Sequence, residues 1–195
     1  MSGLGLNAAP AGTTDYAARI AAELAEAVRG IDPAQAEPFA EALDRAANVF
    51  TAGAGRSGMM ARALAMRLMH GGSSAHVVGE TTTPGIGPGD LLVIASGSGE
   101  TRTLVPMAEK ARELGAEVAV VTLKPDSTLA KLATLVVRLP GASKSREDDD
   151  YETIQPMGSL FEQTLLLFFD ASVLRLMQRR GLDGGRMYGR HANLE

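Results

Sequence analysis

Short apolar runs alternate with amphipathic segments along most of this chain. The strand-like runs cover 49–52, 75–78, 91–95, 118–123 and 135–139. Segments with helical spacing of apolar residues lie between them, at 59–70, 102–114 and 127–133. Continuous apolar runs are typical of strands that are buried on both faces, and their alternation with helices predicts a parallel sheet covered on both sides.

Further helices are predicted at both ends of this core. Thr13 and Thr14 are suited to cap a first helix that ends at Gly30, and Asp32-Pro33 opens a second that runs to about Asn48. The segment 158–180 is apolar on nearly every side and ends in two arginines, which suit the carboxyl end of a helix.

The pattern therefore predicts an α/β fold, a three-layer, doubly wound, five-stranded parallel sheet with two N-terminal helices. We expect one domain over 1–195, with N-terminal helices at about 13–48, a sheet core at about 49–140, and a long helix at about 158–180 followed by a tail. The tail shows no apolar periodicity, and 141–150 is a polar loop.

Composition narrows the classes of function. A chain of 195 residues with a net charge of −4 lacks the basic field that nucleic-acid binding needs. There is no cysteine, so neither disulfides nor thiolate chemistry is available, and three scattered histidines do not form a zinc set. We expect no metal and no cofactor. The start does not resemble a secretory signal and the longest apolar run, 165–169, cannot span a bilayer, so we expect a cytoplasmic protein without membrane contact.

The first candidate ligand loop follows the strand at 49–52. Gly53, Gly55 and Gly58 match the spacing of a dinucleotide-binding turn, and Glu80 stands roughly where an acidic ribose partner is expected. Arg56 with Ser57, however, favours a bound anion. A tight turn alone would explain the glycines but not this pair.

The second candidate loop follows the strand at 91–95. It combines Ser96, Ser98 and Thr101 with Gly97, Gly99 and Glu100, and we expect it to open directly into a helix. Backbone N–H groups, hydroxyls and the positive helix end would then converge on a phosphate. A plain helix cap and turn is the simpler interpretation, and Arg102 is either a phosphate partner or a solvated charge. No Lys-Ser/Thr pair follows the glycines, which disfavours a nucleoside triphosphate.

Several segments resemble the SIS family of phosphosugar isomerases and phosphosugar-binding regulators, and within it the 6-phospho-3-hexuloisomerases. They are 50–58 (FTAGAGRSG), 66–70 (MRLMH), 78–84 (VGETTTP), 96–101 (SGSGET), 154–163 (IQPMGSLFEQ) and 190–195 (RHANLE). The resemblance implies a flavodoxin-like SIS fold and interconversion of D-arabino-hex-3-ulose 6-phosphate with D-fructose 6-phosphate, in the ribulose monophosphate pathway of formaldehyde fixation. It also implies a homotetramer with sites near subunit contacts.

Moving a carbonyl between C3 and C2 needs one group that removes and returns a proton through a cis-enediol. Glu162 is the candidate, although Ser159 and Glu162 also fit a capping box that would make this glutamate structural. The resemblance favours catalysis, because the matching glutamate in the hexuloisomerases is assigned as proton acceptor. Glu152 and Glu80 are rival carboxylates.

His191 is a second catalytic candidate, which could polarise the carbonyl or move hydroxyl protons, with a neighbouring subunit's site within the reach of the tail as one option. We expect His70 and His76 to be structural. The residues expected to bind substrate are Arg56, Ser57, Ser96, Gly97, Ser98, Gly99, Glu100, Thr101 and Arg102. Three alternatives stay open: a phosphosugar-binding sensor without turnover, another ketose or aldose phosphate isomerase, and a nucleotide-dependent dehydrogenase.

Overall fold

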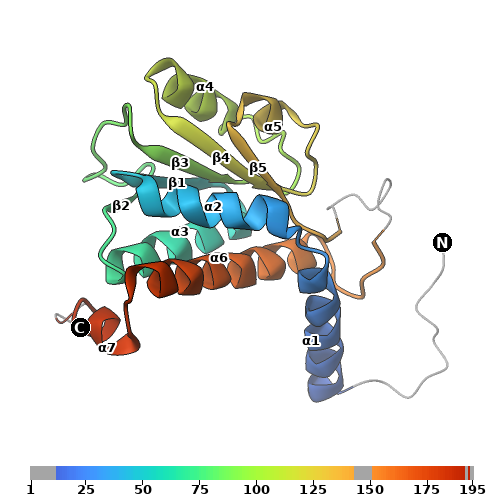
Figure 1. The fold of residues 1–195 in the computed structure, drawn as a ribbon. Helices are drawn as coiled ribbons and strands as arrows, with labels where there is room; N and C mark the ends of the chain where they lie inside the picture. Colours follow the sequence, from blue (N-terminus) through green and yellow to red (C-terminus); the bar gives the residue numbers. More distant parts are fainter. Residues whose placement is uncertain (1–11, 143–150, 192, 194–195) are drawn as a thin grey trace.

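Five parallel strands form the centre of the protein, in the order β2-β1-β3-β4-β5 (Figure 1). The structure is a computed structural model and describes residues 12–142, 151–191 and 193. The strands are β1 Val49–Gly53, β2 Ala75–Val77, β3 Leu91–Ala95, β4 Glu117–Thr122 and β5 Leu135–Arg138. The predicted α/β class is confirmed. From β1 the chain adds β2 on one side and β3, β4 and β5 on the other, so the topological switch point lies between β1 and β3. Ligands of such sheets bind at the switch point, beyond the carboxyl ends of the strands.

Alternate residues of each strand enter two separate cores. In β3, Leu91 and Val93 belong to the core on one face, and Leu92 and Ile94 to the core on the other. All five residues of β3 are buried. Burial on both faces explains why this strand has no polar position, as the apolar pattern predicted.

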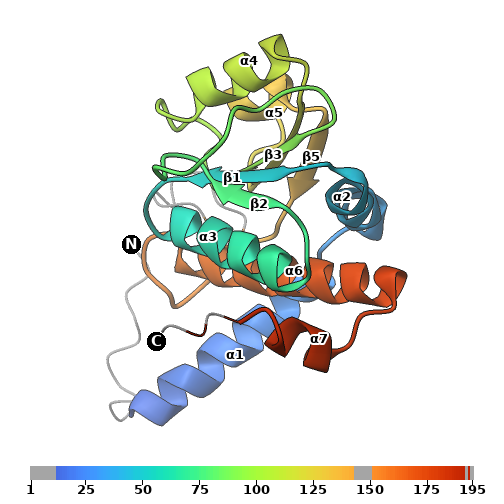
Figure 2. The same ribbon diagram turned by 90° about the vertical axis from the view of Figure 1, so that its left-hand side faces the viewer.

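Helices cover the two faces of the sheet (Figures 1 and 2). On one face lie α2 Pro33–Arg45, α3 Gly55–His70 and α6 Ser159–Arg180, and on the other α4 Val105–Glu113 and α5 Thr128–Leu132. The first helix, α1 Thr13–Arg29, contacts α6 and projects from the body, with Ala27 as its single buried residue.

Helix boundaries near the N-terminus agree only in part with the sequence pattern. Asp32 caps α2 as predicted, with Oδ1 accepting a hydrogen bond from the Ala34 N–H at 2.9 Å, but the helix ends at Arg45 because the next residue is extended. The prediction that Thr13 or Thr14 caps α1 was wrong. Gly12 occupies that position, and its N–H donates to the Asp15 carboxylate at 2.9 Å.

The tail contains a short helix that the sequence pattern did not predict, α7 Gly184–Tyr188. Met187 packs against the core beside α6, and this tertiary contact stabilises a segment too short for apolar periodicity to reveal. The predicted loop at 141–150 lies mostly outside the described residues. In the described part of the chain, no helix is both long and apolar enough to cross a bilayer.

Candidate functional site

The first glycine-rich segment joins β1 directly to α3. The helix begins at Gly55, so Arg56 and Ser57 lie in its first turn; the prediction of a loop up to Gly58 was wrong. The reason is a close backbone contact: a Cβ on Gly58 would lie 2.5 Å from the Gly53 carbonyl oxygen. Without side chains at these two positions, the helix can start immediately after the strand.

The second loop follows β3 and is held by its own hydroxyl groups. Ser96 Oγ lies 3.0 Å from Thr101 Oγ1 and accepts a hydrogen bond from the Gly99 N–H at 3.2 Å. Ser98 Oγ accepts from the Glu100 N–H at 3.2 Å. A hydroxyl can accept and donate at once, so Ser98 keeps its proton for a ligand.

Two glycines allow this loop to pack against its neighbours. Gly99 has a φ of +64°, and a Cβ there would lie 1.9 Å from Ser127 Oγ. A Cβ on Gly97 would lie 3.1 Å from Cδ1 of Phe161 in α6. Gly99 therefore needs glycine for steric reasons before any ligand is considered, whereas a Cβ on Gly97 would make a tight contact with the Phe161 ring.

The loop does not open directly into a helix, and that prediction was wrong. A turn comes first, in which the Leu104 N–H donates to the Thr101 carbonyl at 2.9 Å, and α4 begins at Val105. Pro106 suits this first helical turn because its missing N–H has no partner there in any helix. Arg102 is exposed in the turn, outside the cavity described below.

The start of α6 brings Glu162 to Arg56. Gly158 is the N-cap, and the Ser159 hydroxyl donates to the Pro156 carbonyl at 2.8 Å while accepting from Arg56 Nη1 at 2.9 Å. Arg56 Nε lies 3.1 Å from Glu162 Oε2. The capping-box alternative is therefore wrong: Glu162 does not reach back to the helix start but pairs with α3.

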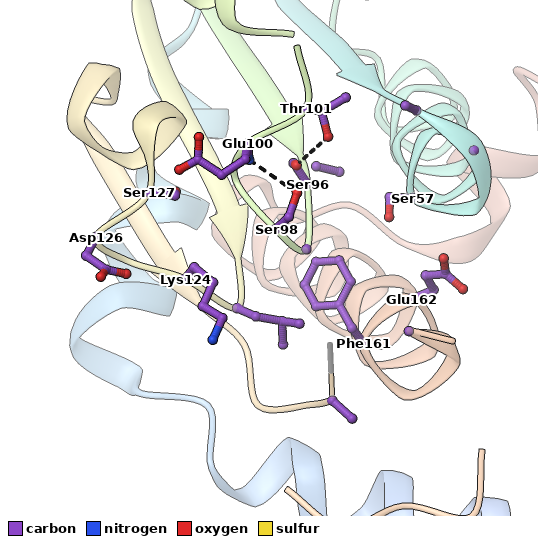
Figure 3. A pocket seen from close by; sticks show the side chains of 17 residues that line it. Ser57, Ser96, Ser98, Glu100, Thr101, Lys124, Asp126, Ser127, Phe161 and Glu162 are labelled. Carbon is purple, nitrogen blue, oxygen red and sulfur yellow. Dashed lines mark hydrogen bonds between the residues drawn. The ribbon is translucent and has the colours of Figure 1, made fainter. Parts of the chain in front are cut away.

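A cavity of about 620 Å³ lies where these segments meet, beyond the ends of β1, β3 and β4. Ser57 and Glu162 lie on one side of it, and Ser96 and Ser98 across from them (Figure 3). Its lining consists of Ala54, Gly55, Ser57, Ala95, Ser96, Gly97, Ser98, Glu100, Thr101, Leu123, Lys124, Asp126, Ser127, Ala142, Gly158, Phe161 and Glu162. The Glu162 side chain is only 8% exposed, so a nearly buried carboxylate lines the same cavity as the hydroxyl-rich loop.

Other charged groups complete the lining. Glu100 points toward α5, where Oε1 accepts from the Thr128 N–H at 2.7 Å, and hydrogen bonds from Thr128 hold its pKa below the ordinary value (Figure 3). The sequence pattern did not single out Lys124 or Asp126. They follow β4, so the rule that ligands bind beyond strand ends could have found them. Lys124 is the one cation that lines the cavity among the described residues.

His191 lies beside Tyr188 of α7, and α7 lies at the opposite end of α6 from the helix start that lines the cavity (Figure 1). Its ring centroid is 5.3 Å from that of His70 and 6.5 Å from that of Tyr188. Burial lowers the pKa of His70, and the nearby His191 and Arg67 lower it further. Within one chain, the two predicted catalytic residues do not meet.

The remaining sequence candidates lie away from the cavity. Glu80 pairs with Arg62 at 3.1 Å on the surface, and His76 Nε2 lies 3.1 Å from a serine hydroxyl. Glu152 lines a second, separate cavity beside α1. Within 12–142, 151–191 and 193, no cluster of three or more His, Asp or Glu side chains is arranged to hold a metal ion.

Comparison with known proteins agrees with the fold. The SIS domain family model matches residues 42–170. The 3-hexulose-6-phosphate isomerase of Bacillus subtilis (strain 168) is 51% identical over 94% of this chain and 99% of its own length. The 3-hexulose-6-phosphate isomerase of Mycobacterium gastri is 44% identical over 89% of this chain and 86% of its own.

A solved structure gives the same picture. A hypothetical protein from Methanococcus jannaschii, for which the crystal structure inferred a molecular function of 3-hexulose-6-phosphate isomerase, has a TM-score of 0.79 and 29% identity, covering 92% of this chain and 99% of that one. The name 3-hexulose-6-phosphate isomerase denotes the same activity as 6-phospho-3-hexuloisomerase. The chain therefore belongs to the SIS domain family, in the group that includes the 3-hexulose-6-phosphate isomerases, and is an isomerase.

Proposed function

We propose that this enzyme interconverts D-arabino-hex-3-ulose 6-phosphate and D-fructose 6-phosphate through a cis-enediol, as a step of the ribulose monophosphate pathway of formaldehyde fixation. The observation that carries this proposal is the position of Glu162. Its carboxylate is nearly buried, lines the cavity, and lies across from the hydroxyls of the loop after β3. One end of the cavity thus suits a phosphate and the other a proton transfer.

Glu162 takes the proton from C2 while a C2–C3 double bond forms and the C3 carbonyl oxygen gains negative charge. The proton of the 2-hydroxyl moves to O3, and Glu162 returns its proton to C3, which leaves the carbonyl at C2. One carboxylate on one face of the enediol is enough for both transfers. Arg56 Nε, 3.1 Å from Glu162 Oε2, holds the direction of the carboxylate before substrate binds.

The phosphoryl group is expected against the loop after β3. Ser98 and one hydroxyl of the hydrogen-bonded Ser96–Thr101 pair supply donors there, and Lys124 supplies a positive charge from the next strand end. Ser57 lies on the Glu162 side and is placed to donate to an oxygen of the enediol (Figure 3). A dianion bound to donors at several points would hold C2 and C3 over the base.

The active form is proposed to be a homotetramer in the cytoplasm, with sites near subunit contacts. One observation supports a partner chain. Large apolar side chains are exposed on neighbouring helices, Met59 on α3 at 61% and Leu174 on α6 at 64%. His191 lies far from the cavity of its own chain, so a role in the reaction requires the site of another copy.

Glu162→Gln tests the proposal. We expect kcat for fructose 6-phosphate formation to fall at least about 100-fold, because the amide cannot accept the C2 proton, while the dissociation constant for fructose 6-phosphate changes less than about threefold. The measurements are a coupled assay with hex-3-ulose 6-phosphate and a calorimetric titration of fructose 6-phosphate.

Glu152→Gln is the matched control, because that carboxylate lines the other cavity, and it should keep wild-type turnover. Near-normal turnover of Glu162→Gln would remove Glu162 from the mechanism. Wild-type protein that binds fructose 6-phosphate without turnover would instead indicate a sensor, and turnover of a different ketose or aldose phosphate in a substrate panel would change the substrate assignment.

A further inference from the structure

Glu23, on the projecting helix α1, accepts three hydrogen bonds from the segment that leads into α6. Thr153 Oγ1 donates at 2.6 Å, the Ile154 N–H at 2.8 Å and Gln155 Nε2 at 3.0 Å. The Gln155 side chain is buried, although most of α1 is exposed. One carboxylate therefore fixes three successive residues just before the candidate active-site helix.

The contacts continue from this anchor to the catalytic carboxylate. The Pro156 carbonyl, next after Gln155, accepts from the Ser159 hydroxyl at 2.8 Å and the Ser159 N–H at 3.2 Å. Ser159 Oγ accepts from Arg56 Nη1, and Arg56 Nε lies 3.1 Å from Glu162. A connected set of hydrogen bonds and one ion pair thus joins α1 to Glu162.

The backbone conformation along this path must be stabilised by contacts from outside the segment. Met157, between Pro156 and the N-cap, has a φ of +62° with its side chain 62% exposed. A non-glycine residue in this region is strained by about 1 kcal/mol or more, and such conformations persist only where surrounding contacts enforce them. The bonds to Glu23 supply such contacts on the N-terminal side.

We propose that Glu23 is a positioning residue for the isomerase reaction: by holding 153–156 it holds Ser159 and Arg56, and through them the orientation of Glu162. This inference rests on the proposed role of Glu162. Glu23 lies outside residues 42–170 that the SIS domain model matches, so the anchor is a feature that the helix α1 adds to the family domain.

The charge of Glu23 agrees with this role. Burial raises its pKa, but the hydrogen bonds from Ile154, Thr153 and Gln155, together with the charge of Arg19, outweigh that effect and lower the pKa below its ordinary value. The carboxylate is therefore ionised across the neutral range, and three donors point at it. An amide in its place would direct its own N–H protons toward donors.

Glu23→Gln provides the test. We expect kcat to fall about tenfold while KM stays within about twofold, because the phosphate loop after β3 lies outside the anchored path. In an Arg56→Ala background the same substitution should change kcat less than about twofold, since the link to Glu162 is already broken. Amides of 153–162 should exchange hydrogen at least about tenfold faster in Glu23→Gln than in wild type.

Glu26→Gln is the matched control: it lies on the same helix, pairs with Arg29 at 2.6 Å, and should leave kcat and exchange unchanged. Unchanged kcat, or an equal loss in both backgrounds, would overturn the proposal. If Glu23→Gln does not fold, Thr153→Val removes one donor and should lower kcat in the same direction, and no loss would overturn the idea. If the wild-type enzyme does not convert hex-3-ulose 6-phosphate, the proposed function fails. The positioning role of Glu23 is judged separately: equal hydrogen-exchange rates at 153–162 in wild type and Glu23→Gln would overturn it.

Discussion

Gly99 shows how a single residue decides the shape of the candidate phosphate loop. Its φ of +64° is readily adopted by glycine alone, and the space where a Cβ would stand is filled by Ser127. The N–H of the same residue donates to Ser96 Oγ at 3.2 Å. A glycine here thus brings the loop onto α5 and keeps the serine hydroxyls facing the cavity.

Gly99→Ala is expected to destabilise the protein by about 2–3 kcal/mol, from the left-handed backbone together with the clash at Ser127. Because the loop must shift, affinity for fructose 6-phosphate should fall about tenfold or more. Urea unfolding and calorimetric titration measure the two effects. Gly85→Ala is the control, since a Cβ there has open space, and it should change neither. A Gly99→Ala protein with wild-type affinity would contradict the role of this loop.

The role of Glu162 likewise depends on its partner Arg56. In the sequence, one is a glutamate near a helix start and the other an arginine in a glycine-rich segment, and neither position alone identifies a function. Their 3.1 Å contact excludes the capping box and makes the pair a local unit at the cavity.

At the scale of elements, a charged seam joins α2 to the end of α6. Arg180 Nε lies 2.7 Å from Asp44 Oδ1, and Arg179 lies 3.2 Å from both Asp44 and Glu41. The hydrogen bond from Arg180 lowers the pKa of Asp44, burial opposes it, and Arg179 lowers it further. These ion pairs hold the carboxyl end of α6 against α2, and the amino end of α6 carries Glu162.

Asp44→Asn should lower the free energy of unfolding by about 1 kcal/mol at pH 7, a value that allows for solvent screening of a partly exposed pair. Because the folded pKa is depressed, this contribution is present above the unfolded pKa of about 3.9 and is lost as pH falls through the folded value. The difference between wild type and variant should therefore shrink as the pH falls below about 3.9.

Urea unfolding from pH 7 down to about pH 3 measures this dependence. Glu113→Gln is the control, because its pair with Lys110 is exposed on both sides and should contribute little. A difference that persists unchanged in acid would show that Asp44 acts through something other than its charge.

At the scale of the whole molecule, the separation of Glu162 from His191 along α6 bears on assembly. If His191 acts, it must do so at the cavity of another copy. Mixing Glu162→Gln with His191→Ala after joint refolding should then restore about a quarter of wild-type turnover, the share of random pairings in which one site receives both intact residues.

The measurement is turnover of the mixture against each variant alone. Turnover of the mixture that does not exceed the turnover of the two variants measured separately would contradict a shared site. Joint refolding of wild type with His191→Ala serves as control and should show activity in proportion to the intact His191 present.

Local sequence determined the strands and the composition of the loops that follow them, whereas the choice of Glu162 came from the resemblance to the hexuloisomerases. Buried strands such as Leu91–Ala95 consist of apolar residues because both faces are covered, and hydroxyls with glycines mark the loop after that strand. These signals arise from neighbours in the chain, and the sequence pattern therefore predicted them, with strand ends displaced by a residue or so.

Tertiary structure decided where helices begin and which polar groups meet. The start of α3 at Gly55 depends on a backbone contact with Gly53, and the partner of Ser159 is Arg56, 103 residues away. The hold of Glu23 on Thr153 joins residues 130 apart. The spacing of residues along the chain does not predict such pairs, because they form only when folding brings distant segments together.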